Sequence, residues 1–168
     1  MENKVLFKET QRFRQWWIWL ILLLINVSSI WFLIEKYVYK KQFPDTAYHS
    51  YSGAGIFGLI LILITILFLS AKLTTKISAD GIEARFSPFH FHTKKYLWDD
   101  IISAKVRQYS PLKEYGGWGI RFGSDGKAYN VLGNKGIQVV FKDGSKLLIG
   151  TQKPDEAAQA LSNFIPKK

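Results

Sequence analysis

Two long apolar runs dominate the first 71 residues of the chain. The run from Trp16 to Ile34 holds nineteen residues without a charged side chain, and the run from Gly53 to Ala71 holds another nineteen. At 1.5 Å per residue each run forms a helix of about 28 Å, close to the roughly 30 Å hydrocarbon core of a bilayer. The pattern predicts a transmembrane hairpin over 16–71, with helices at 16–34 and 53–71, a loop at 35–52 and a basic segment at 1–15.

Side chains within these runs predict how the helices sit. Aromatic residues crowd the ends of the first run: Trp16, Trp17, Trp19 and Trp31. Amphipathic rings prefer headgroup depth, so we expect these residues to act as membrane-interface anchors. Ala54 and Gly58 form a small-xxx-small face in the second run, and we expect them to let helices approach closely.

The charges that flank the runs predict the orientation of the hairpin. A short loop forces two antiparallel helices, so both ends of the hairpin share one side of the membrane. The fifteen residues before Trp16 and the fifteen after Ala71 hold seven Lys and Arg, against three in the loop. The positive-inside rule then predicts a two-span inner-membrane protein with cytoplasmic termini. The length of the first run, with no small-x-small cleavage site after Ile34, favours an anchor over a signal peptide.

Residues 72–168 read as a β-rich domain. Leu73, Thr75 and Ile77 alternate with more polar positions, which is the period-two pattern of a strand. Asp-Gly pairs, which favour tight hairpin turns, occur at 80–81, 125–126 and 143–144. We expect about seven short antiparallel strands, followed by a helix over 154–165 that begins at Pro154.

Short motifs within this domain carry a family resemblance. In order, they are T-x-K-I-x-x-D-G-I at 74–82, W-D-D-I at 98–101, G-G-W-G-I-R at 116–121, G-x-x-G-I-x-V at 133–139 and I-G-T-x-x-P at 149–154. The chain resembles bacterial pleckstrin-homology-like (PH-like) membrane proteins, in which a transmembrane hairpin precedes such a domain. The resemblance implies an all-β (α+β) PH-like barrel with a C-terminal helix, and it implies no particular activity. Lipid-binding PH domains hold phosphate on a long first hairpin loop, whereas the connection at 79–81 is short.

The charge of the domain suggests the nature of a partner. The chain has 23 Lys and Arg against 13 Asp and Glu, a net charge of +10, and residues 72–168 contribute sixteen against nine, a net charge of +7. A basic domain beside a membrane suits anionic headgroups, although cytoplasmic faces of such proteins are often basic without a ligand. The candidate contact residues for anionic lipid or a partner are Lys94, Lys95, Lys105, Arg107, Lys113 and Arg121.

Other candidate sites are weaker. Tyr109, Tyr115 and Trp118 surround an expected irregular loop, where they either form an interface or cover one end of the sheet. His90 and His92 have the spacing of a chelating pair, but a metal needs further ligands, and an amphipathic strand or loop edge is the favoured explanation. Asp99-Asp100 lies on no catalytic motif, and the chain has no cysteine. We therefore expect no catalytic residues, cofactor or metal.

These patterns favour a non-enzymatic, membrane-anchored binding module that contacts the bilayer, its anionic phospholipids, or an unidentified protein partner. The alternative is a small scaffold that self-associates through its transmembrane helices, and a remote alternative is a lipid-modifying enzyme. Nucleic acid is not an expected partner, because the basic side would have to face away from the lipid.

Overall fold

A computed structural model describes residues 5–42, 50–123 and 125–164 of the chain. The chain divides into two units: residues 1–13 with 71–168 form the first, and residues 14–70 form the second. This division differs from the expected separate segment at 1–15, because Val5–Arg12 is a strand of the first unit. The domain is therefore built from both sides of the helical hairpin.

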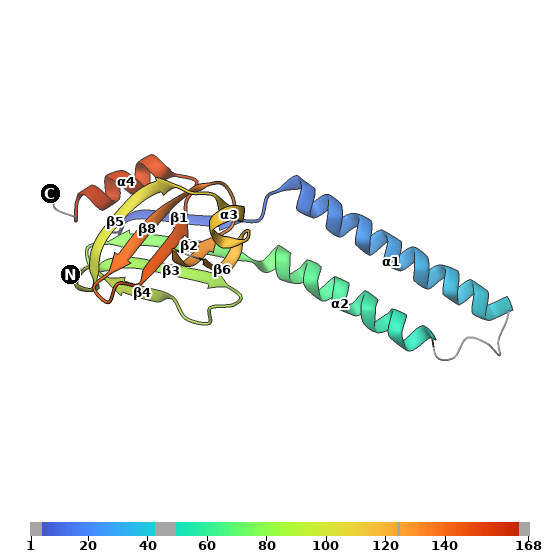
Figure 1. The fold of residues 1–168 in the computed structure, drawn as a ribbon. Coiled ribbons are helices and arrows are strands. Elements are labelled where there is room, and N and C mark those ends of the chain that lie inside the picture. Colours follow the sequence, from blue (N-terminus) through green and yellow to red (C-terminus); the bar gives the residue numbers. More distant parts are fainter. Residues whose placement is uncertain (1–4, 43–49, 124, 165–168) are drawn as a thin grey trace. The chain divides into compact units, whose positions relative to one another are not determined.

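The second unit is a pair of helices, α1 (Trp16–Gln42) and α2 (Ser50–Ser70) (Figure 1). The predicted loop at 35–52 is too long: α1 continues past Ile34 because no helix-breaking residue occurs before Pro44. Within the described residues, Trp16–Glu35 is long and apolar enough to cross a membrane, and the apolar stretch Gly55–Ser70 is shorter.

Contacts between α1 and α2 follow small and polar residues. Asn26 donates from Nδ2 to Thr65 Oγ1 at 3.0 Å, and to the Leu22 carbonyl at 2.7 Å. Gly58 is buried, and a Cβ placed there would lie 3.5 Å from both Ser29 Oγ and Leu33 Cδ1. The predicted close approach at Gly58 thus lies within one chain; the side chain of Ala54 is outside the described part.

The first unit contains two sheets in its described part. Sheet A has the order β1 (Val5–Arg12), β2 (Lys72–Ser78), β3 (Gly81–Ser87), β4 (Lys94–Leu97). Sheet B has the order β5 (Ile101–Gln108), β8 (Lys135–Phe141), β9 (Lys146–Gly150), β7 (Gly126–Asn130), β6 (Gly119–Gly123). A 3-10 turn, η2 (Trp98–Asp100), joins β4 to β5.

The strand pattern departs from the predicted barrel in three respects. The described residues form nine strands where seven were expected, and β7 pairs with β9 in parallel. Among these residues, no strand of sheet A pairs with one of sheet B, so the barrel is not closed. The predicted turns at Asp80-Gly81 and Asp143-Gly144 are confirmed, and the Asp125-Gly126 pair lies at the β6–β7 hairpin.

The core lies between the two sheets. Strand alternation sends Leu73, Ile77 and Phe86 from sheet A inward, where each is at most 1% exposed. Ile137 and Ile149 do the same from sheet B. Each such side chain contributes about 1.5–3 kcal/mol to folding by leaving water.

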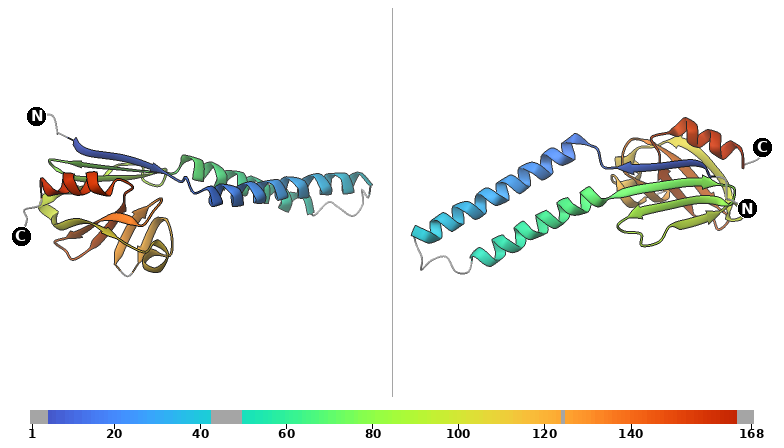
Figure 2. Two further views of the ribbon diagram at one scale, coloured as in Figure 1. Left: turned by 90° about the horizontal axis from the view of Figure 1, so that it is seen from above. Right: turned by 180° about the vertical axis from the view of Figure 1, so that it is seen from behind.

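The C-terminal helix α4 (Pro154–Ser162) covers an edge of this core (Figure 2). It contacts β5 and β8 of sheet B and β1 and β2 of sheet A. Ala157, Ala160 and Leu161 are its buried residues, and Phe164 stacks on Trp98 with ring centroids 5.2 Å apart. The helix therefore ties the edge strands of the two sheets together.

Strand β1 is fastened to the segment before α4 by buried polar groups. Glu9 is 7% exposed; its carboxylate accepts hydrogen bonds from Thr151 Oγ1 at 2.7 Å and from the Gln152 N–H at 2.9 Å. Gln11 donates from Nε2 to the Gly150 carbonyl at 2.6 Å. Because polar Glu9 and Gln11 occupy inward positions, hydropathy alone did not indicate a strand in this segment.

Candidate functional site: a basic groove on sheet A

The outer face of sheet A carries a polar groove of about 270 Å³. Its lining comes from the outward positions of β1, β2 and β3 and from the following loop: Lys8, Thr10, Lys72, Thr74, Lys76, Glu83, Arg85, Ser87 and Thr93. Period-two alternation places these side chains opposite the core residues of the same strands. The groove is therefore a direct product of the strand pattern.

The strand register arranges the lining in rows across the sheet. In the central row, Thr74 pairs with Thr10 on one side and with Arg85 on the other. The Thr10 and Thr74 hydroxyl oxygens lie 3.2 Å apart, within hydrogen-bonding distance. Lys72 pairs with Ser87 at the end of the sheet where β2 begins. These two rows each bring a cation and a hydroxyl together, whereas the third row sets Lys8 and Lys76 beside Glu83.

The groove has a strong excess of positive charge. Four cationic side chains, those of Lys8, Lys72, Lys76 and Arg85, face a single carboxylate, that of Glu83, which gives a net charge of +3. Lys76 lies 3.9 Å from Glu83, and within the described residues Lys8, Lys72 and Arg85 form no ion pair.

Ammonium, guanidinium and hydroxyl groups are all hydrogen-bond donors, and the charged ones bind anions more strongly than neutral donors do. Guanidinium in particular matches the oxygens of phosphate or carboxylate in a two-point contact. The lining can therefore hold an oxyanion such as phosphate.

The predicted contact residues do not form this groove. Lys94 and Lys95 lie on β4, beside β3, and Lys95 is paired with Asp80 at 3.0 Å. The others lie on sheet B or on α3 (Pro111–Tyr115), which connects β5 to β6. Arg121 donates from Nε to the Trp118 carbonyl at 2.9 Å. Lys105 and Lys113 are exposed on β5 and α3.

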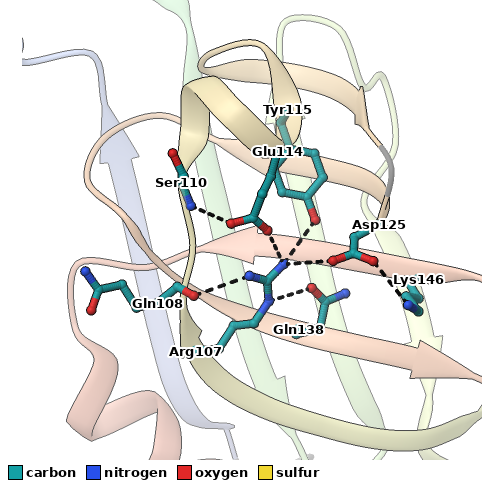
Figure 3. A network of polar contacts seen from close by, with 8 residues as sticks. All are labelled: Arg107, Gln108, Ser110, Glu114, Tyr115, Asp125, Gln138 and Lys146. Carbon is teal, nitrogen blue, oxygen red and sulfur yellow. Dashed lines mark hydrogen bonds and ion pairs between the residues drawn. The ribbon is translucent and has the colours of Figure 1, made fainter.

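Arg107 is part of an internal network (Figure 3). Its Nη2 lies 2.7 Å from Glu114 Oε2 and 3.7 Å from Asp125 Oδ2, and its Nε donates to Gln138 Oε1 at 3.0 Å. Glu114 also accepts a hydrogen bond from the Ser110 N–H at 2.6 Å. These contacts join α3 and the β6–β7 turn to strands β5 and β8, which is a structural role.

The Arg107 contact changes the acid–base behaviour of Glu114. The hydrogen bond from Arg107 lowers the pKa of the Glu114 carboxyl, against an opposing effect of desolvation, and the Ser110 N–H lowers it further. The carboxylate form is thus favoured because two donors point at it.

The expected aromatic loop is an ordered part of the core. Tyr109 and Tyr115 are 4% and 3% exposed, and they pack edge to face with centroids 6.0 Å apart. Burial is the main cause that raises the pKa of the Tyr109 hydroxyl, to about 12. Trp118 is half-buried and donates from Nε1 to the Gly133 carbonyl at 3.2 Å. Tyr109 and Tyr115 therefore cover one end of the sheet and are unavailable as an interface.

His90 and His92 do not converge on a metal site. His90 Nδ1 accepts a hydrogen bond from the Phe86 N–H at 3.2 Å, and its ring meets Tyr129 edge to face at 4.9 Å. His92 is exposed. Among the described residues, no group of three or more His, Cys, Asp or Glu side chains is placed to hold a metal ion.

The groove was not predicted from the sequence because the N-terminal strand, which supplies Lys8 and Thr10, was missed. Lys8 and Thr10 alternate with buried Phe7, Glu9 and Gln11, which is a period-two signal once polar inward positions are allowed. Lys72, Thr74 and Lys76 alternate similarly with Leu73 and Ile77 in the strand that was predicted.

No family model, no curated protein and no solved structure matches this chain.

Proposed function

We propose that this protein is a non-enzymatic, membrane-anchored binding module whose sheet A groove binds the phosphate headgroups of anionic lipids. The observation that carries the proposal is the groove lining: four cations and four hydroxyls against one carboxylate. Basic residues beside an anionic leaflet contribute about 1 kcal/mol each to membrane attraction. The helical hairpin supplies the anchor and the groove supplies the selectivity for lipid.

The strand pairing supports a two-span anchor. The apolar stretch Trp16–Glu35 is long and apolar enough to cross a membrane, and it is followed by the shorter described stretch Gly55–Ser70. Strand β1 precedes α1 and pairs with β2, which follows α2. Paired strands share one side of a membrane, so a hairpin that enters the bilayer must return. Cleavage after α1 would also remove β1, which argues against a signal sequence.

The charge distribution supports a cytoplasmic location for the domain. Seven Lys and Arg flank the hairpin on the domain side, against three between the apolar runs. Lys8, Arg12 and Lys72 are among them and belong to sheet A. By the positive-inside rule this excess favours a cytoplasmic location, where the leaflet is anionic.

A PH-like assignment of the domain belongs to the same proposal. Two facing sheets with a C-terminal helix at their edge support it. The parallel β7–β9 pair and the extra strand β1 are departures from a barrel of seven antiparallel strands. The groove on the sheet face would replace the long hairpin loop on which lipid-binding PH domains hold phosphate.

Native mass spectrometry of the full chain tests the proposal. The protein in neutral detergent is offered equal amounts of phosphatidylglycerol and phosphatidylcholine, and retained lipid is counted. We expect preferential retention of phosphatidylglycerol, and a loss of about tenfold or more in a Lys72→Glu/Arg85→Glu variant, because hydrogen bonds to charged groups contribute about 1.5–3 kcal/mol each.

The matched control is Lys105→Glu/Lys113→Glu, which makes the same charge change at exposed positions outside sheet A. Equal losses of retained phosphatidylglycerol in both variants would show a general charge effect and would contradict binding in the groove. Inorganic phosphate that binds as tightly as phosphatidylglycerol would assign the groove to a soluble phosphate ligand and overturn the lipid assignment.

A further inference from the structure

The β3–β4 loop, residues 88–93, exposes two phenylalanine side chains. Phe89 is 52% exposed and Phe91 is 86% exposed. Both follow Ser87, and Thr93 ends the loop; Ser87 and Thr93 line the groove. The two residues belong to one six-residue loop, and grouped exposed apolar side chains, unlike single ones, mark interaction sites.

Contacts within the loop hold it in a defined shape. The His90 N–H donates to the Phe86 carbonyl at 2.8 Å, and the Phe86 N–H donates to His90 Nδ1 at 3.2 Å. The Phe89 ring lies 5.9 Å from that of Phe86, and His90 packs on Tyr129. With His90 turned inward, Phe91 extends into solvent from an anchored base.

The register puts this loop at a particular end of sheet A. Ser87, the last residue of β3, pairs with Lys72, the first residue of β2, which in turn pairs with Arg12, the last residue of β1. The chain leaves Arg12 toward α1 through three residues, and Ala71 alone separates α2 from Lys72. The loop thus leaves the sheet at the end to which both helices are joined.

The surroundings of the loop are cationic. Arg85 precedes it in β3 and Lys94 follows it in β4, and both are exposed, whereas the next residue, Lys95, is paired with Asp80. The pKa of the His90 imidazole is lowered, first by burial and then by Lys94 and Lys127. Exposed aromatic rings flanked by Lys and Arg are the composition with which proteins enter the membrane interface.

We propose that the Phe89–Phe91 tip inserts into the headgroup region of the membrane that the hairpin spans, so that the groove meets lipid headgroups. The inference rests on the proposed function and names the second element that engages the same bilayer. The occupant is lipid, because the tip combines apolar rings with a cationic border. The strand ends in register with the base of the loop, Arg12 and Lys72, are also within a few residues of α1 and α2.

Site-directed spin labelling tests the proposal, since the chain contains no cysteine and a single introduced thiol is unique. The full chain with Phe91→Cys is labelled and reconstituted in vesicles of equal parts phosphatidylcholine and phosphatidylglycerol. Oxygen concentrates in the bilayer and a water-soluble nickel chelate stays outside, so their relative collision rates with the nitroxide report depth.

The matched control is Ala79→Cys, at the exposed turn at the opposite end of the same β2–β3 hairpin. Leu23→Cys, within α1, reports insertion of the hairpin itself. We expect the ratio of oxygen to nickel collisions to be raised several-fold at 91 relative to 79, and highest at 23.

The labels at 91 and 23 distinguish failure of tip insertion from failure of the membrane anchor. A label at 91 that is as accessible to nickel as the label at 79, while 23 is shielded, would overturn tip insertion and leave the anchor standing. Nickel access at 23 as well would overturn both the anchor and the tip. Retention of phosphatidylglycerol by the groove is measured independently of these labels. The double change Phe89→Ser/Phe91→Ser should make spin labels at neighbouring loop positions more accessible to nickel. It should not abolish the retention of phosphatidylglycerol.

Discussion

Arg12 and Lys72 are backbone partners in sheet A, although both helices lie between them in the chain. The pairing makes the N-terminal strand part of the same folded unit as the residues that follow the hairpin. It also joins the two ends of the hairpin through the sheet, so a membrane that the hairpin entered would have both ends on one side.

Removal of residues 1–12 should therefore destabilise the domain and not merely shorten it. The deletion exposes the edge of β2 and leaves the partners of Glu9 and Gln11 near 150–152 unpaired. We expect loss of the cooperative thermal transition of the β signal in circular dichroism. A full-length Lys8→Ser/Thr10→Ser variant, altered on the outward face of the same strand, should melt near the wild-type temperature. Unchanged melting of the deletion would show that β1 is dispensable.

A single residue within that strand gives a sharper test. Glu9→Ala leaves the buried Thr151 hydroxyl and the partly buried Gln152 N–H without their acceptor. We expect a loss of about 1–3 kcal/mol in the free energy of unfolding, because an unsatisfied buried group costs that much. Urea unfolding in detergent measures it. The exposed Lys8→Ala change on the same strand should cost less than about 0.5 kcal/mol. Equal effects of the two changes would argue against the buried contact.

The size of the side chain at position 58 should determine how closely α1 and α2 approach each other. A Cβ there would meet Ser29 and Leu33 at 3.5 Å, which is ordinary van der Waals contact. Gly58→Ala is therefore expected to be tolerated, whereas the branched side chain of Gly58→Leu should force the helices apart. Distances between spin labels on α1 and α2 measure the separation. If Gly58→Leu instead changes only the oligomeric state in detergent, the glycine serves contacts between chains.

The Arg107–Glu114 contact predicts a pH dependence of stability. The pKa of Glu114 is lower in the folded chain than its ordinary 4.5, so the contact stabilises the fold fully above that pH. This stability is lost as the pH falls from about 4.5 through the folded pKa. Glu114→Gln, which cannot titrate, should be less stable at pH 7 and show a shallower loss in acid.

Urea unfolding between pH 7 and acid checks the Glu114 prediction. Glu156→Gln removes a carboxyl that is exposed on α4 and serves as the control. If the acid slope of Glu114→Gln equals that of the wild type, another group is responsible for the acid sensitivity.

Local patterns determined much of this protein. The apolar runs specified two helices because their length and uniform hydropathy can be read from the local sequence, without knowledge of tertiary contacts. Asp-Gly pairs at 80–81 and 143–144 specified turns because their backbone preference is local. Pro154 and the apolar spacing that follows it specified α4 for the same reason.

Only the tertiary structure decided where the site lies. Strand β1 contains polar Glu9 and Gln11 at buried positions, and these are acceptable there only because residues 150–152 supply their hydrogen bonds. Arg107 has the sequence pattern of a surface cation, yet in the folded domain it forms an ion pair with Glu114 and a hydrogen bond with Gln138. The groove exists because the pairing of β1 with β2 sets Lys8 beside Lys76. Strands that are distant in sequence leave no local signal that they will pair.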